Sequence, residues 1–170
     1  RLAERVAHLQ VGSGFDSGVT QGPLINERAV AKVEEHVQDA LAHGAELLCG
    51  GERHALGHGF FQPTVLSGVT ARMQVATQET FGPLAAVFRF GSEAEAVQMA
   101  NDTEFGLAAY CYTRDLGRAW RMSEALEYGM VGINEGLIST EVAPFGGIKS
   151  SGLGREGSKY GIEDYLEIKY

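Results

Sequence analysis

The sequence predicts an α/β fold in which helices flank a parallel sheet. Short apolar runs at 84–88, 107–112 and 131–134 are typical of buried strands. Stretches with helical periodicity, at 92–100 and 115–126, separate these runs. An alternation of strands and helices favours βαβ units, because parallel neighbours need a long crossover connection.

The first half of the chain predicts two helices and two strands. Apolar residues fall on one helical face at 2–9, and Asn26 is expected to cap a second helix that Gly44 ends. A buried strand is expected at 47–49, before two glycines. Strand-like residues at 60–66 form the next candidate, with a proline that indicates a sheet edge.

The second half carries two helix-start signals and an unusual tail. Ser92 and Glu95 have the spacing of a capping box, and Asp115 is expected to cap the following helix. At 165–170 apolar and polar residues alternate, which predicts a strand with one apolar face at the edge of a sheet.

Composition and charge exclude several classes of protein. Of the 170 residues, 44% are hydrophobic and 21% are charged, which is typical of soluble globular domains. No apolar run approaches the roughly 20 residues of a membrane helix. The net charge of -8 and the lack of a basic patch disfavour nucleic acid or an anionic membrane as a partner.

The cysteines and histidines do not predict a catalytic or metal site. Cys49 and Cys111 do not form a disulfide framework, lie in apolar surroundings and are interpreted as structural thiols in a reducing compartment. His54 and His58 are four residues apart, but the glycines around them argue against a helix that would aim both at a metal. We therefore expect no metal site.

Residues 144–156 form the most distinctive stretch, with four glycines among 13 residues. Such a segment presents backbone rather than side chains, so Phe145 is the side chain expected to contact a ligand. Residues 152–157 also satisfy G-x-G-x-x-G. No hydrophobic strand directly precedes them and the chain ends too soon for the distal acidic residue, so they are not interpreted as a dinucleotide loop.

Three motifs in this order resemble the C-terminal part of the NAD(P)-dependent aldehyde dehydrogenases. They are Glu-Thr-Phe-Gly-Pro at 79–83, Asn-Asp-Thr-Glu-Phe-Gly-Leu at 101–107 and the glycine-rich stretch at 144–156. The resemblance covers nearly the whole chain. Residues 134–139 and 157–165 are similar to the succinate-semialdehyde dehydrogenase branch of that family.

The resemblance implies a domain organisation. Residues 1–157 would be part of the catalytic α/β/α domain and residues 158–170 an oligomerisation segment, so the chain is expected to be a fragment of a longer enzyme. In this family the terminal strand joins the sheet of a neighbouring subunit, which predicts a homo-oligomer. From the alternating pattern alone, an edge strand within its own domain is equally open.

The resemblance also assigns four site residues. Glu79 would hold the nicotinamide ribose and Phe81 would lie against the nicotinamide. Ser139 would help hold the distal carboxylate of the substrate, and Phe145 would line the passage of the aldehyde. From the residues alone, a surface glutamate, a core phenylalanine and a solvated loop serine remain open.

The expected reaction of the full-length protein is oxidation of succinate semialdehyde to succinate with NAD or NADP, a step of 4-aminobutyrate degradation. In this family a cysteine thiolate adds to the aldehyde, hydride passes to the nicotinamide, and a glutamate-activated water releases the acid. Neither Cys49 nor Cys111 follows Gly-Gln-x, so no catalytic residue is expected here and the chain alone should be inactive.

Other functions stay open at this point. Glutarate semialdehyde could be the substrate, or the chain could be a non-catalytic oligomerisation module. The cofactor would be bound mainly by an N-terminal domain outside this sequence. The expected location is the cytoplasm, or the mitochondrial matrix in a eukaryote.

Overall fold

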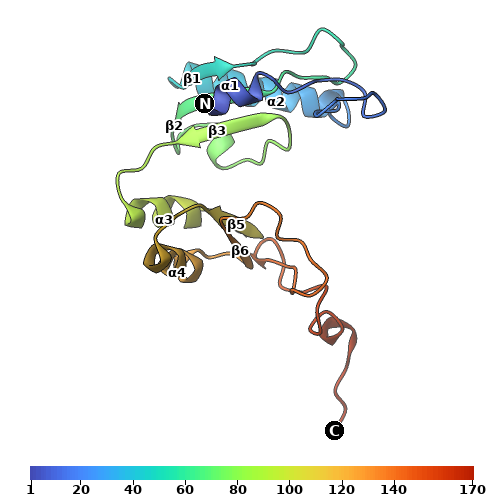
Figure 1. Cartoon of the computed structure of the whole chain (residues 1–170), viewed down its shortest axis with the longest axis vertical. Coiled ribbons are helices and arrows are strands. Elements are labelled where there is room, and N and C mark those ends of the chain that lie inside the picture. The colour runs from blue at the N-terminus through green and yellow to red at the C-terminus, as the bar shows by residue number, and fades with distance from the viewer. The chain divides into compact units, whose positions relative to one another are not determined.

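The computed structural model describes residues 1–170, which divide into two compact units, 1–89 and 90–170 (Figure 1). Helices alternate with parallel and antiparallel strands, so the predicted α/β class is confirmed. The boundary predicted between 157 and 158 stays a prediction.

The first unit is built on a three-stranded sheet in the order β1-β2-β3. Its strands are β1 (Glu46–Cys49), β2 (Thr64–Val69) and β3 (Leu84–Phe88). β1 runs antiparallel to β2, and β3 runs parallel to it. The strand predicted at 84–88 is confirmed, whereas the one expected at 60–66 begins only after Pro63, which has no N–H to give to a ladder. The edge position that Pro63 indicated is wrong, because β2 lies between β1 and β3 and the proline only precedes it.

The strand predicted at 47–49 is present, but the prediction that it is buried is wrong. β1 pairs with β2 alone, so it forms an edge of the sheet. The side chains of Leu47 and Leu48 are 39% and 45% exposed. A run of three apolar residues is too short to distinguish a central strand from an edge strand.

Helix α2 (Glu27–Ala42) covers the core of the first unit, which also contains α1 (Leu2–Val6) and the 3-10 turn η1 (Gln74–Ala76). The predicted cap is confirmed, since the Asn26 side chain accepts a hydrogen bond of 3.0 Å from the Ala29 N–H. The predicted stop at Gly44 is also confirmed, with φ at +94°. α1 ends earlier than the helical pattern at 2–9 suggested.

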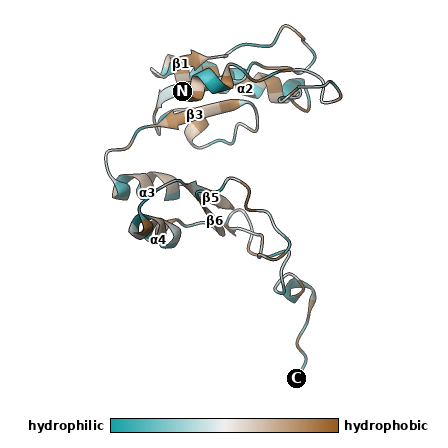
Figure 2. Cartoon of the chain, viewed as in Figure 1, coloured by the Kyte–Doolittle hydropathy of each residue, from teal (hydrophilic) through white to brown (hydrophobic).

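The core of the first unit forms between α2 and the sheet. One cluster of buried residues surrounds Leu66 and Met73, and a second joins the valines of α2 to Phe61. Figure 2 shows β3 as an apolar strand, and its Leu84 packs against both clusters. Because the valines repeat every three to four positions, a single face of α2 contributes all of them.

An ion-pair network fastens the loop after β1 to the polar face of α2. The Arg53 guanidinium donates two hydrogen bonds of 2.7 Å to the Glu34 carboxylate and a third to Glu27. Arg53 lowers the pKa of Glu34, mainly through its hydrogen bonds to the carboxylate and to a smaller extent through its charge. Partial burial of Glu34 acts in the opposite direction. A bidentate pair of this kind fixes direction as well as distance.

The second unit contains two helices, four strands and a short 3-10 turn. These elements are α3 (Glu93–Asn101), β4 (Phe105–Gly106), β5 (Ala108–Cys111), α4 (Leu116–Ala125), β6 (Met130–Ile133), β7 (Ile148–Lys149) and η2 (Glu163–Tyr165). β5, α4 and β6 form a parallel βαβ unit, as predicted. β3 belongs to the sheet of the first unit, where it pairs with β2.

Both helix-start signals of the second unit are confirmed. The Ser92 hydroxyl accepts from the Glu95 N–H at 3.1 Å, and Asp115 accepts from the Arg118 N–H at 2.6 Å. The Glu95 carboxylate reaches back to the N–H of Gly91 at 2.6 Å. The reciprocal hydrogen bond of a capping box usually comes from the N–H of the N-cap residue, whereas here it comes from Gly91, one residue before the N-cap.

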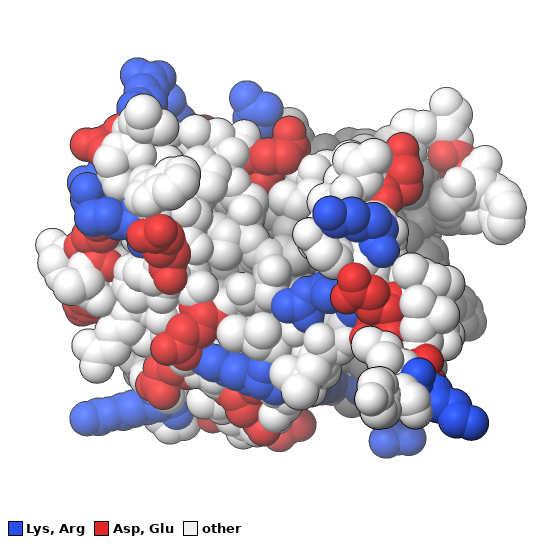
Figure 3. All heavy atoms as spheres, turned by 90° about the horizontal axis from the view of Figure 1, so that it is seen from below, with Lys and Arg blue, Asp and Glu red and all other residues white.

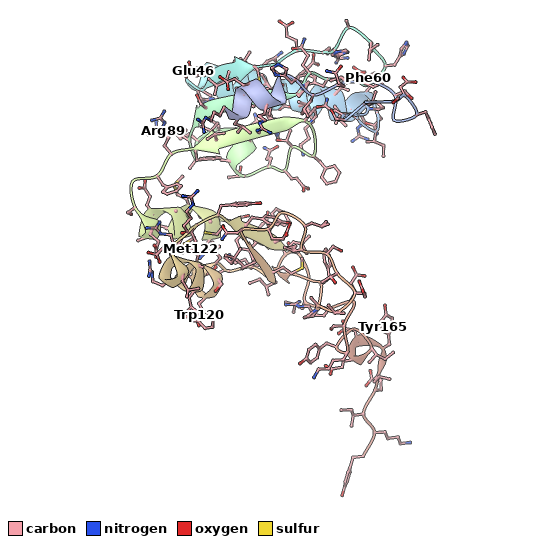
Figure 4. The ribbon with its side chains drawn as sticks, viewed as in Figure 1. Glu46, Phe60, Arg89, Trp120, Met122 and Tyr165 are labelled. Carbon is pink, nitrogen blue, oxygen red and sulfur yellow. The ribbon has the colours of Figure 1, made fainter.

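A cluster of charged side chains joins α3 to α4. The Glu93 carboxylate accepts hydrogen bonds from Arg121 at 2.6 and 2.8 Å and from Arg118 at 2.9 Å. On α4, Met122 is buried, whereas Trp120 is 68% exposed and projects from the helix (Figure 4). The two arginines thus join α4 to Glu93 of α3.

The tail is not a strand within this chain. η2 ends at Tyr165, and Leu166 continues in an extended conformation with φ at -111° and ψ at 139°. No ladder forms between the tail and another strand of this chain. Pairing with a neighbouring subunit stays a prediction.

The surface carries both signs of charge. On the face drawn in Figure 3, basic and acidic side chains are interspersed and no continuous basic area is visible. None of the helices is long and apolar enough to span a bilayer.

We predict that Glu93→Gln weakens the second unit in a pH-dependent way. Hydrogen bonds from Arg121 and then Arg118 lower the pKa of Glu93 from 4.5 to about 2. A depressed folded-state pKa stabilises the fold above pH 4.5, and this stabilisation is lost as the pH falls towards 2. The difference between the urea midpoints of wild type and variant should therefore be full at pH 7, smaller at pH 3 and absent near pH 2.

The matched control is Glu124→Gln, on α4 but without a recorded ion pair. It should shift the midpoint little at any of these pH values. A difference between wild type and Glu93→Gln that is the same at pH 7 and pH 3 would contradict the assignment.

Candidate functional site

In the first unit, the candidate binding groups lie on the loop between η1 and β3. The Glu79 carboxylate is exposed and has no hydrogen-bond or ion-pair partner. Phe81 is 83% exposed, and its φ of +38° lies in the left-handed region. Between them, the Thr80 hydroxyl lies 2.8 Å from Nδ1 of His36 on α2. The loop therefore presents an unpaired carboxylate and an exposed aromatic ring. Its backbone is held to α2 by the hydrogen bond between Thr80 and His36.

The loop after β6 is shaped by Asn134 and Glu135. Asn134 has φ at +56°, and its side-chain amide makes two hydrogen bonds of 2.8 Å with the backbone N–H and C=O of Thr113. The Glu135 carboxylate accepts from the N–H groups of Leu137 and Gly136 at 3.0 and 2.8 Å. These backbone hydrogen bonds lower the pKa of Glu135, so the turn is held by an ionised carboxylate at neutral pH.

Ser139 and Phe145 meet at one hollow of about 180 Å³ in the second unit. Its lining is mostly apolar and comes from strands β5 and β6, the loop after β6 and the start of the glycine-rich stretch. The lining residues are Leu107, Ala108, Tyr110, Met130, Gly136, Leu137, Ile138, Ser139 and Phe145. A small molecule with an apolar middle and one polar end suits such a lining.

A second hollow of about 340 Å³ adjoins the glycine-rich stretch. Phe145 and Leu107 line both hollows. The backbone of Phe145 pairs with Glu156 through two hydrogen bonds of 2.8 Å, which closes the stretch into a loop. Phe145 therefore borders both hollows from a closed loop.

Close backbone contacts hold the glycine-rich loop against the start of β6. A Cβ at Gly129 would collide with the carbonyl oxygen of Gly146, and one at Gly146 would collide with that of Gly154. Nη1 of Arg155 donates hydrogen bonds to three carbonyl oxygens of the loop, at Gly147, Leu153 and Gly154, over 2.7 to 3.0 Å. Backbone packing and one guanidinium thus set the position of Phe145.

Lys149 fastens the same loop to the end of α3. Its ammonium donates to the carbonyl oxygens of Asn101 and Thr103 at 3.0 and 3.3 Å, and pairs with Glu127 at 2.7 Å. Its backbone φ is +54°. This lysine is fully engaged in structure, so it has no donor left for a ligand.

The cysteines and histidines singled out in the sequence do not gather into a catalytic or metal-binding group. Cys49 and Cys111 are free thiols, and no group of three His, Cys, Asp or Glu side chains gathers to hold a metal. No helix follows 152–157, so the context of a dinucleotide loop is absent.

Sequence reasoning missed several residues that shape these sites. His36, Asn134 and Arg155 position the candidate loops, and Tyr110 lines the smaller hollow. Asn134 could have been predicted to shape a turn, because it directly follows an apolar strand and asparagine tolerates the left-handed region of φ and ψ. His36 gave no such signal, since a histidine on the apolar face of a helix has many possible partners.

The comparisons with known proteins agree with one another. The model of the aldehyde dehydrogenase family matches residues 1–170. The succinate semialdehyde dehydrogenase of Acinetobacter baylyi is 69% identical over 166 residues, which cover 98% of this chain and 34% of that protein. The NADP(+) succinate-semialdehyde dehydrogenase of Escherichia coli K12 is 66% identical, over 100% of this chain and 35% of that protein.

Other relatives differ in the substrate that they are named for. The glutarate-semialdehyde dehydrogenase of Pseudomonas aeruginosa is 65% identical over 100% of this chain and 35% of its own length. The crystal structure of the succinate-semialdehyde dehydrogenase of Burkholderia pseudomallei superimposes with a TM-score of 0.94 and 71% identity, over 96% of this chain and 34% of that one. This chain thus spans about a third of these relatives.

We predict that Gly129→Ala dislodges the glycine-rich loop. The added methyl group meets the Gly146 carbonyl, and neither backbone can yield without moving Phe145. Overpacking of this kind costs about 1–3 kcal/mol of unfolding free energy. Urea unfolding should report the loss.

Gly91→Ala is the matched control in the same unit, because its nearest neighbour is a flexible carboxylate oxygen at 3.4 Å. It should change stability by less than about 0.5 kcal/mol. Equal stability of the two variants would show that the close contact does not constrain the loop.

Proposed function

Because this chain belongs to the aldehyde dehydrogenase family, we propose that the full-length protein oxidises succinate semialdehyde to succinate with NAD+ or NADP+. The observation that carries the proposal is the match of nearly the whole chain to two relatives named for this substrate, at 69% and 66% identity. Glutarate semialdehyde is the second candidate, because a relative named for it is 65% identical.

The substrate would be held at the smaller hollow. Its distal carboxylate accepts a hydrogen bond from the Ser139 hydroxyl, and the apolar lining around Phe145 excludes water from the carbon chain. Succinate semialdehyde and glutarate semialdehyde differ by one methylene, which in a site of this kind changes kcat/KM only about 10- to 200-fold. The length of the hollow, rather than its polarity, therefore sets the preference between them.

The nicotinamide end of the cofactor would be held by the loop of the first unit. The Glu79 carboxylate, free of other partners, can accept hydrogen bonds from both hydroxyls of a ribose, and the open Phe81 ring can lie against a planar heterocycle. The cofactor, when bound, accepts a hydride. The rest of the dinucleotide would be bound by sequence outside this chain.

On this proposal the chain supplies binding groups and no catalytic residue. Neither Cys49 nor Cys111 has the sequence context of the family's nucleophile, and the thiol and the water-activating glutamate would come from the remainder of the protein. The location would be a reducing compartment, such as the cytoplasm or the mitochondrial matrix, because two cysteines do not make a disulfide framework.

We also propose that residues 158–170 associate with a second copy of the protein. Beyond η2 the backbone is extended and unpaired, and Ile168 is 98% exposed. An unpaired segment with alternating apolar side chains is a template for strand addition. The tail would thereby join the sheet of its neighbour, and residues 1–157 would form part of the catalytic domain.

We predict that Ser139→Ala impairs acidic aldehydes selectively. A hydrogen bond to a charged group contributes about 1.5–3 kcal/mol, so kcat/KM for succinate semialdehyde should fall roughly 10- to 100-fold in the full-length enzyme. A neutral aldehyde such as butanal should lose much less. Steady-state kinetics with succinate semialdehyde, glutarate semialdehyde and butanal decide both the role of Ser139 and the preferred substrate.

Thr140→Ala serves as the control, because Thr140 does not line the hollow. Its kinetics should match those of wild type. Equal losses for acidic and neutral aldehydes in Ser139→Ala would remove the proposed carboxylate contact.

We predict that removing residues 165–170 lowers the subunit number of the full-length protein. Sedimentation velocity should show a smaller particle, because the extended segment can no longer pair with a neighbour. Ile168→Lys should weaken the assembly, whereas Glu167→Gln, on the opposite face of an extended segment, should not. An unchanged mass after the deletion would take the tail out of the interface.

A further inference from the structure

One face of α2 holds the loop that carries Glu79 and Phe81. Val33, His36 and Asp39 follow one another at intervals of three residues, so they lie in a row along the helix. Each holds a different point of the segment 74–82, and the contacts bracket Glu79 on both sides.

The three contacts differ in kind. The Asp39 carboxylate accepts a hydrogen bond of 2.7 Å from the N–H of Gln74, where the segment begins. Nδ1 of His36 lies 2.8 Å from the Thr80 hydroxyl. A Cβ built at Gly82 would lie 2.5 Å from the Val33 side chain, so the backbone there touches the helix directly.

Packing alone does not account for a histidine at position 36. The side chain is 1% exposed, and its Nε2 is buried without a hydrogen-bond partner. An apolar residue of similar shape would fill this space without leaving a polar atom unpaired. The hydrogen bond to Thr80 is the one polar contact recorded for the imidazole.

The conformation of Phe81 requires an external constraint. A positive φ is uncommon for a bulky residue and persists only where the surroundings fix it. The Phe81 ring is exposed, so its own packing does not fix the backbone. Its neighbours do, since Thr80 is bonded to His36 and Gly82 lies against Val33.

We propose that His36 is a positioning residue for the nicotinamide end of the cofactor. By binding the Thr80 hydroxyl, it fixes the backbone from which the Glu79 carboxylate and the Phe81 ring reach the nucleotide. The inference rests on the proposed function, because it assumes that this loop contacts the cofactor.

The test uses isosteric pairs of variants in the full-length protein. Thr80→Val replaces the hydroxyl with a methyl group, and Thr80→Ser retains the hydroxyl. His36→Leu removes the imidazole, whereas His36→Asn places an amide near the position of Nδ1 and deletes the unpaired Nε2. The hydrogen bond is thus lost in one member of each pair and kept in the other.

The first readout needs no cofactor. Amide hydrogen exchange of the segment 77–83, measured by mass spectrometry, should speed up in Thr80→Val and His36→Leu, and should stay near wild type in Thr80→Ser and His36→Asn. Exchange that is unchanged in both bond-deleting variants would overturn the proposal, because the loop would then be held without the bond.

The second readout is dinucleotide affinity. Fluorescence titrations with NADH and with NADPH should give dissociation constants raised roughly 3- to 10-fold in the bond-deleting variants, the range expected for one neutral hydrogen bond. The KM for the aldehyde should stay unchanged. The double variant His36→Leu/Thr80→Val should bind no worse than either single one, since the same bond is lost.

Glu79→Gln separates this inference from the proposed function. If it weakens dinucleotide binding while Thr80→Val and His36→Leu do not, the loop binds cofactor but His36 does not position it. If neither Glu79→Gln nor the bond-deleting variants change the affinity, the assignment of the loop to the cofactor fails and the positioning role fails with it.

Discussion

The second unit depends on a backbone contact that only glycine permits. The glycine-rich loop lies against the start of β6 so closely that a methyl group at Gly129 or Gly146 has no room. Side chains therefore contribute little there, and the polar groups of the loop are satisfied by Arg155 and by backbone pairing. Phe145 belongs to this closely packed backbone. A residue of an irregular segment can therefore line a hollow at a defined position.

The loop of the first unit is also fixed at its backbone, but by contacts with the side chains of a helix. Glu79 and Phe81 are exposed there, and α2 fixes the backbone that carries them through its contacts with Thr80 and Gly82. In both units the groups proposed to bind ligands are exposed or border a hollow, and contacts of the neighbouring backbone orient them. This separation lets a binding group stay unpaired until a ligand arrives without leaving its position undefined.

Local features of the fold and the βαβ unit of β5, α4 and β6 were predictable, whereas the other strand pairings were not. The caps at Asn26, Ser92 and Asp115 depend on side chains that bond within three residues, so the sequence alone is sufficient. The partner of β3 and the edge position of β1 depend on strands far along the chain. The four site residues came from resemblance to a family, whereas His36 became visible only when the structure placed it beside Thr80.

The location of Phe145 has a consequence for the size of molecule that the second unit can admit. Phe145 and Leu107 line both hollows, of about 180 and 340 Å³. Phe145 is the one aromatic residue common to both linings, and its backbone is paired with Glu156. A smaller side chain at this position would enlarge both hollows, so the range of accepted molecules can change by substitution at one position while the fold stays the same.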